Sequence, residues 1–259
     1  MRAGSTSGDI LAAPNRRLLE DLAWANVTLV FDYDGTLAPT VGDPDEAVMP
    51  RSTRDRLVEA AQLYPCAVLS GRAYEDVARF LEGVPLTLVV GNHGAEWEWD
   101  PPGVARLEEQ VRRWRRELAR ALAPYPGVVV EDKRYSLTVH YRHAGRRGAA
   151  RAIRAAASRL EGARLLGGKE CVSVVPRGSE TKGSALQRIR TLCRCEAAVY
   201  VGDDVTDEDV FVLKEPWLLG IRVGRGERTS ARFRLRRQAD IDALLDVFIR
   251  CRRRTSMAR

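Results

Sequence analysis

The chain has 259 residues, of which 45% are hydrophobic and 30% are charged, so one large domain or two small ones can bury a core and global disorder is not expected. No apolar run approaches the length of a membrane span, and residues 1–22 lack the apolar stretch of a signal peptide, so we expect a cytoplasmic protein with no membrane partner. The formal net charge of +7 suits nucleic acid or any anionic substrate, and five cysteines form no disulfide framework in a chain of this length.

Apolar residues at helical spacing alternate along the chain with short apolar runs. Helices are predicted over residues 15–25, 52–63, 106–123, 148–160, 181–193 and 238–250. Strands are predicted over residues 27–31, 66–69, 86–90, 127–131, 135–141, 165–175, 197–201 and 218–223. We expect residues 1–14 to be frayed and residues 251–259 to form a disordered basic tail. Strands separated by helices predict an α/β fold with a doubly wound parallel sheet.

The buried strand predicted over 27–31 ends in the sequence DYDGTLAP. Asp32 and Asp34 stand two residues apart there, and burying them without partners would be costly. In open α/β sheets ligands bind outside the carboxyl ends of the strands, so Asp32 and Asp34 stand where chemistry is expected. Gly35 allows a turn and lets a backbone N–H approach a bound anion.

The strand predicted over 66–69 ends in Ser70, Gly71 and Arg72. A hydroxyl at a strand end followed by glycine is a good donor to a phosphate oxygen, and the next helix adds its amino-terminal amides. Taken alone, the three residues favour an ordinary turn between a strand and a helix, but their spacing after DYDGT matches the second motif of the family named below, which makes Ser70 a candidate phosphate ligand. Arg72 is expected either to cap that helix or to reach a substrate.

Pro101, Pro102 and Gly103 predict a domain boundary. We therefore divide the chain into a core of residues 1–100 and 176–259 and an inserted α+β cap of residues 101–175. Within the cap, alternating apolar and polar residues predict a half-exposed antiparallel sheet.

Lys182 is predicted to lie at the start of the helix over 181–193, where a cation is unfavourable unless an anion is near. The strand over 197–201 is followed by GDDVTDEDVF, in which five acidic residues fall within 203–209. They would repel one another without a cation, and oxygen ligands on a strand-end loop suit Mg²⁺. We expect Mg²⁺ as the cofactor.

DYDGTLAP and GDDVTDEDVF together resemble two motifs of the haloacid dehalogenase (HAD) phosphatase superfamily. GNHGAEW (91–97) and EDKRYSLTVHYR (131–142) resemble segments of the trehalose-6-phosphate phosphatase family. The resemblance implies an HAD-like core with a C2-type cap. It also implies an Mg²⁺-dependent phosphatase that releases phosphate from a sugar phosphate, trehalose 6-phosphate by default, in trehalose biosynthesis.

The resemblance also implies residue roles. Asp32 is the nucleophile that forms an aspartyl-phosphate, Asp34 is the general acid and base, and Lys182 pairs with the nucleophile and the phosphate. Phosphate ligands are Ser70, Gly71, Gly35 and Lys182. Metal ligands or residues that orient the metal site are Asp32, Asp34 through its carbonyl, Asp203, Asp204 and Asp207. Substrate-binding candidates are Arg72, Asn92, His93, Gly94, Lys133, Arg142, Lys169 and Ser173.

One departure from the family concerns the cap. Where the family usually has a glutamate that binds the sugar, four residues after Lys169, this chain has Ser173, and Val175 replaces a usual basic residue. A carboxylate accepts hydrogen bonds from two hydroxyls at once, and serine does not. The substrate therefore stays open between trehalose 6-phosphate and a related disaccharide or pseudo-disaccharide phosphate of secondary metabolism.

Two other classes of function stay open. The basic charge and the arginines of residues 106–120 favour a nucleic-acid-binding protein, although the chain has no helix-turn-helix, RNA-recognition or zinc-finger signature and a solvated helix face explains the arginines. A phospho-acceptor signalling domain would use Asp32. The two motifs above, the match of Ser70 and Lys182 to the second and third motifs of the HAD superfamily, and the interposed cap argue against it. We expect a monomer that acts on a small sugar phosphate, with no nucleic-acid partner.

Overall fold

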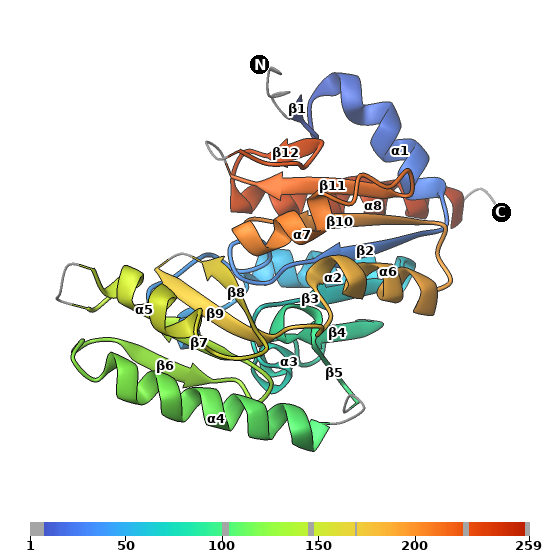
Figure 1. Cartoon of the computed structure of the whole chain (residues 1–259). Helices are drawn as coiled ribbons and strands as arrows, with labels where there is room; N and C mark the ends of the chain where they lie inside the picture. Colours follow the sequence, from blue (N-terminus) through green and yellow to red (C-terminus); the bar gives the residue numbers. More distant parts are fainter. Residues whose placement is uncertain (1–7, 100–103, 145–147, 169, 225–227, 257–259) are drawn as a thin grey trace, which may run out of the picture.

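Two β-sheets organise the chain (Figure 1). The computed structural model describes residues 8–99, 104–144, 148–168, 170–224 and 228–256. The larger sheet has the strand order β1-β12-β11-β10-β2-β3-β4-β5, and only the pair β4–β5 is antiparallel. Its strands are β1 (Gly8–Asp9), β12 (Phe233–Leu235), β11 (Leu218–Val223), β10 (Ala197–Gly202), β2 (Val27–Phe31), β3 (Cys66–Leu69), β4 (Leu88–Gly91) and β5 (Glu96–Trp97).

Helices cover both faces of the larger sheet. The alternation of side chains along β2 shows why: Leu29 and Phe31 join the core on one face, and Val30 joins the core on the other. The first face carries α1 (Arg16–Trp24), α2 (Arg51–Leu63), α3 (Tyr74–Phe80) and α8 (Ile241–Ser256), and the second carries α6 (Lys182–Leu192) and α7 (Glu208–Phe211). The predicted doubly wound α/β fold is thereby confirmed.

The smaller sheet is antiparallel, with the order β6-β7-β9-β8. Its elements are α4 (Val104–Leu122), β6 (Val129–Asp132), β7 (Leu137–His140), α5 (Ala149–Ala157), β8 (Ala163–Gly168) and β9 (Cys171–Pro176). One face packs on α4 and α5 through Leu137, Val139, Val172 and Val174. The residues between them, among them Thr138 and Ser173, face a pocket. The alternation predicted for this segment therefore builds an α+β cap with one apolar and one polar face.

Three expectations for local structure were wrong or incomplete. Gly8–Asp9 is not frayed, because it adds a parallel strand beside β12. The end of the chain is helical through Ser256, since Arg252 donates to the Ala25 carbonyl and Arg253 pairs with Glu59. The segment 165–175, predicted to be strand, is divided between two antiparallel strands, β8 and β9.

The cap boundaries stay a prediction, because residues 100–103 lie outside the described part of the chain. All elements of the smaller sheet and its two helices fall within 104–176. Among the described residues, no helix has the length and apolarity that crossing a membrane requires.

Candidate active site

A pocket of about 550 Å³ lies between the two sheets. The core contributes the loops that follow β2, β3, β4 and β10, because the carboxyl ends of parallel strands meet at one edge of a sheet. The cap contributes the polar face of its sheet. The predicted residues that line the pocket are Asp32, Asp34, Gly71, Arg72, His93, Lys133, Arg142, Ser173, Lys182, Asp203 and Asp204.

Lys182 connects the loops at the core end of the pocket. It is the first residue of α6, whose start is fixed by a capping box between Thr181 and Ser184. Its Nζ donates to Asp32 Oδ1 at 2.7 Å and to Asp207 Oδ1 at 2.6 Å, and all three side chains are buried. Burial alone would lower the pKa of Lys182, but the charges of Asp207 and Asp32 outweigh it and raise that pKa well above its usual value. The ammonium therefore stays charged.

Asp32 follows the central strand β2, and its backbone N–H continues the sheet by donating to the Val201 carbonyl at 2.8 Å. Burial raises the pKa of the Asp32 carboxyl, and the nearby Lys182 charge opposes that rise. The ion pair with Lys182 is thus the interaction that favours the carboxylate form, which a nucleophile requires.

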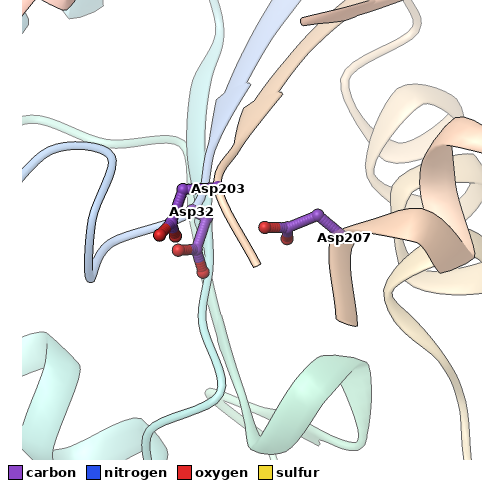
Figure 2. A group of neighbouring side chains, drawn as sticks. All are labelled: Asp32, Asp203 and Asp207. Atoms are coloured by element: carbon purple, nitrogen blue, oxygen red, sulfur yellow. The ribbon is translucent and has the colours of Figure 1, made fainter. Parts of the chain in front are cut away.

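Asp32, Asp203 and Asp207 each offer an oxygen within 4.8 Å of the others (Figure 2). Figure 2 shows the carboxylates of Asp32 and Asp203 side by side, with Asp207 pointing toward them from the opposite side. Gly35, in the left-handed region with a φ of 81°, lies so close to the Asp203 carboxylate that any Cβ would collide with it. An all-oxygen donor set with a glycine cradle fits a hard divalent cation.

Asp34 and Arg72 form a pair across two loops. Arg72 Nε and Nη2 donate to the two carboxylate oxygens of Asp34, both at 2.7 Å. The Arg72 side chain is 11% exposed, and its guanidinium lies over the Phe80 ring, 4.9 Å from the centroid. Arg72, expected to cap a helix or to reach substrate, therefore also orients Asp34.

Ser70 and Gly71 differ in access. Gly71 lines the pocket, and a Cβ there would lie 2.5 Å from the His93 ring, so only glycine fits. Ser70 is fully buried, does not line the pocket, and accepts a hydrogen bond from the Arg72 backbone N–H at 3.1 Å. That bond leaves the Ser70 hydroxyl hydrogen for another acceptor.

The three predicted residues of the loop after β4 differ in their access to the pocket. His93 lines the pocket, and burial together with the Lys182 and Lys133 charges lowers its pKa well below the usual value, so the imidazole is neutral. Asn92 is fully buried behind it, and Gly94 packs against the Thr181 carbonyl. Neither Asn92 nor Gly94 lines the pocket.

The cap residues come from the polar face of its sheet and its loops. Lys133 Nζ donates to the Gly71 carbonyl at 3.0 Å, and Arg142 donates to Glu170 at 2.7 Å and to the Gly42 carbonyl at 3.0 Å. Lys133 thus connects the cap to the core, and Arg142 connects the cap both to the core and to Glu170 of the cap itself. Ser173 Oγ lies 3.3 Å from Thr138 Oγ1. Lys169 lies outside the described residues.

A family model described as trehalose-phosphatase matches residues 30–236. The chain belongs to the trehalose-phosphatase family. The trehalose-phosphate phosphatase of Mycobacterium bovis is 34% identical over 232 residues, which are 83% of this chain and 59% of that protein. The same-named protein of Mycobacterium avium is 36% identical over 206 residues, which are 74% of this chain and 52% of that protein. The chain thus spans less than two thirds of the length of these relatives.

Solved structures agree on the fold of the trehalose-phosphatase family. The carboxy-terminal domain of Candida albicans trehalose-6-phosphate phosphatase superposes with a TM-score of 0.76 at 21% identity, covering 94% of this chain and 99% of that chain. A sugar phosphatase described as HAD subclass IIB gives a TM-score of 0.56 at 14% identity, covering 88% and 98%. The predicted family and HAD-like fold are confirmed, and nothing in these comparisons supports the nucleic-acid-binding alternative.

Sequence reasoning missed a pair that lines the pocket of this family member. His140 Nε2 and Glu131 Oε2 lie 2.7 Å apart on adjacent cap strands. Burial alone would raise the pKa of Glu131, but the His140 hydrogen bond and the Lys133 charge lower it. The period-two alternation, which puts Glu131 on the face of Val129, was the signal that could have found it.

Proposed function

We propose that the chain is an Mg²⁺-dependent phosphatase that hydrolyses a sugar phosphate monoester, with trehalose 6-phosphate as the default substrate. The observation that carries the proposal is the pairing of the Lys182 ammonium with both Asp32 and Asp207. Lys182 and Asp32 line the pocket together with Asp203. A buried cation beside a buried carboxylate suits attack on a phosphoryl group, since charge stabilisation supplies most of the rate gain in phosphoryl transfer.

The chain's own residues divide the reaction between them. Asp32 attacks phosphorus in line and becomes an aspartyl-phosphate, which splits one difficult hydrolysis into two easier steps. Asp34, held by Arg72, protonates the leaving sugar oxygen and then takes a proton from the attacking water. Lys182, the Ser70 hydroxyl and the backbone amides near Gly35 and Gly71 bind the equatorial oxygens.

The carboxylates at the strand ends fit Mg²⁺. Asp32 and Asp203 would bind it directly together with the Asp34 carbonyl, while Asp204 and Asp207 orient this group and Lys182. When bound, the ion supplies positive charge that offsets the charge of the phosphate oxygens. Asp207 already accepts hydrogen bonds on both oxygens, which supports an orienting role.

The cap side of the pocket is assigned to the sugar. Lys133, Arg142 and Ser173 line the pocket from the cap, Arg72 and His93 line it from the core, and neutral His93 offers an uncharged hydrogen-bonding ring. For Asn92 and Gly94 we propose a supporting role, because they lie behind the pocket wall. We propose that the enzyme is a monomer and that it is located in the cytoplasm. The free cysteines among the described residues support the cytoplasmic location.

The test is phosphate release from trehalose 6-phosphate with Mg²⁺ and with EDTA, beside glucose 6-phosphate and other sugar phosphates. Fast, metal-dependent release from trehalose 6-phosphate is expected, together with a loss of about a thousandfold or more in Asp32→Asn. Substantial turnover by Asp32→Asn would contradict the mechanism.

A second candidate substrate is a related disaccharide or pseudo-disaccharide phosphate. Ser173 favours it, because the cap presents hydroxyls of Ser173 and Thr138 where the resemblance leads us to expect a carboxylate. A clear preference for another member of the panel would keep the mechanism and change the substrate. Equal rates on trehalose 6-phosphate and glucose 6-phosphate would contradict a disaccharide requirement.

A further inference from the structure

Tyr200 reaches the proposed reaction centre without lining the pocket. It lies on β10 with its side chain in the core under α6 and α7, and it is fully buried. Its ring packs edge-on against Phe211, with centroids 5.9 Å apart. Its hydroxyl donates a hydrogen bond of 2.6 Å to Asp207 Oδ1.

Asp207 is held by three donors. Oδ1 accepts from Lys182 Nζ and from the Tyr200 hydroxyl, each at 2.6 Å, and Oδ2 accepts from the Asp204 backbone N–H at 2.8 Å. The Asp207 carboxylate also lies directly against Gly202, where any added Cβ would collide with it. Asp207 is therefore fixed in place, and what varies is how strongly it attracts Lys182.

The Lys182 ammonium has more than one hydrogen-bond acceptor. Its ammonium has three hydrogens, which Asp32, Asp207 and one phosphoryl oxygen would use completely. The position of Nζ depends on the attraction of each acceptor, and in a buried site that attraction is strong. A second donor on Asp207 Oδ1 weakens the attraction of this oxygen for Nζ.

We propose that Tyr200 is a positioning residue whose hydroxyl shares the negative charge of Asp207 and so keeps Lys182 directed toward Asp32 and the phosphate. The inference rests on the proposed phosphatase function. Burial and the Asp207 charge raise the pKa of Tyr200 well above its usual value, so the hydroxyl remains a donor. Without it, Asp207 draws Lys182 away from the phosphate, and the transition state loses charge stabilisation.

Tyr200→Phe removes the hydroxyl and keeps the ring that packs on Phe211. The matched control is Tyr64→Phe, because Tyr64 is also buried and its hydroxyl shares its one hydrogen between the carbonyls of Ala23 and Phe248, away from the pocket. Three quantities are measured at saturating Mg²⁺, namely kcat and KM for trehalose 6-phosphate and, by calorimetry, the Kd of orthovanadate, a transition-state analogue. A separate Mg²⁺ titration gives the concentration for half-maximal activity.

In Tyr200→Phe we expect kcat to fall about tenfold and the orthovanadate Kd to rise about tenfold, the scale of one hydrogen bond to a charged group. KM and the Mg²⁺ concentration for half-maximal activity are expected to stay within about twofold, since ground-state binding is not the main loss. Tyr64→Phe is expected to lower Tm comparably while changing neither kcat nor Kd.

The path through Asp207 has its own test. In an Asp207→Asn background, Tyr200→Phe is expected to change the orthovanadate Kd by less than about twofold, because the shared charge is gone. An undiminished effect in that background, or a wild-type Kd in Tyr200→Phe, would overturn the inference. If the wild type releases no phosphate from any sugar phosphate, the proposed function is wrong, and the orthovanadate titration still tests the role of Tyr200. If the wild type does not bind orthovanadate, both the proposed function and the role of Tyr200 are wrong.

Discussion

Arg72 holds both carboxylate oxygens of Asp34, with Nε bound to Oδ2 and Nη2 bound to Oδ1, each at 2.7 Å. A bidentate pair fixes the orientation of a carboxylate as well as its charge. The stack of the Arg72 guanidinium on Phe80 fixes the arginine in turn. In the proposed reaction, Asp34 therefore meets the leaving oxygen from a set position.

Arg72→Ala is expected to lower turnover of trehalose 6-phosphate about a hundredfold, the usual contribution of a placed general acid and base. Formation of the aspartyl-phosphate from p-nitrophenyl phosphate should fall much less, because nitrophenolate leaves without a proton. Single-turnover kinetics on both substrates measure the difference. Arg72→Lys keeps the charge without the bidentate geometry, so its turnover of trehalose 6-phosphate should lie between those of the wild type and Arg72→Ala. Equal losses on the two substrates would contradict the role of Arg72.

Ser173→Glu is expected to raise the preference for trehalose 6-phosphate over glucose 6-phosphate. A carboxylate at this pocket position would accept hydrogen bonds from two sugar hydroxyls, which the Ser173 hydroxyl does not do. The ratio of kcat/KM for the two substrates should rise about tenfold, the scale of one added hydrogen bond to a charged group. Ser173→Ala is the control, and an unchanged ratio in Ser173→Glu would show that the residue does not set specificity.

His93 makes the folded state sensitive to acid. Because burial lowers its pKa in the folded chain, the unfolded chain binds a proton below about pH 6.5 that the folded chain does not. The free energy of unfolding therefore falls as the pH decreases from about 6.5 toward the lowered pKa. His93→Asn suits the left-handed backbone, with a φ of 58°, and removes this titration. Urea unfolding at pH 7 and pH 5 should show a smaller loss in the variant than in the wild type; equal losses would contradict the assignment.

Asn92 is expected to stabilise the contact between core and cap. Its amide donates to Glu96 at 2.6 Å and to the Lys133 carbonyl at 2.9 Å, and its oxygen accepts from Ser136 at 2.5 Å. Asn92→Ala removes these three hydrogen bonds and takes the acceptor from the buried Ser136 hydroxyl, while Glu96 keeps the Tyr74 N–H and the Lys133 carbonyl keeps the Tyr135 N–H. The free energy of unfolding should therefore fall by about 2 kcal/mol. Asn92→Gly tests the side chain without strain at the positive φ, and chemical denaturation that shows no loss in either variant would refute the role.

Local patterns in the sequence were enough to predict the α/β fold, its parallel strands and the residues at their ends. Strand-end position and the start of a helix are properties of a few neighbouring residues, so Asp32 and Asp203 at strand ends and Lys182 at a helix start could be named without coordinates. The same local logic predicted a cap with one polar face. It also placed the motifs that resemble the trehalose-phosphatase family, to which the chain belongs.

The family resemblance implied that Lys182 pairs with Asp32, 150 positions away, but only the tertiary structure revealed the other partners. Arg72 pairs with Asp34 across 38 positions, and His140 meets Glu131 through the pairing of two strands. The same holds for the ends of the chain, where β1 and the last turns of α8 depend on distant residues. Such contacts are fixed by the packing of the two sheets and not by spacing along the chain, because a buried polar group must be satisfied by whatever donor or acceptor the fold brings to it.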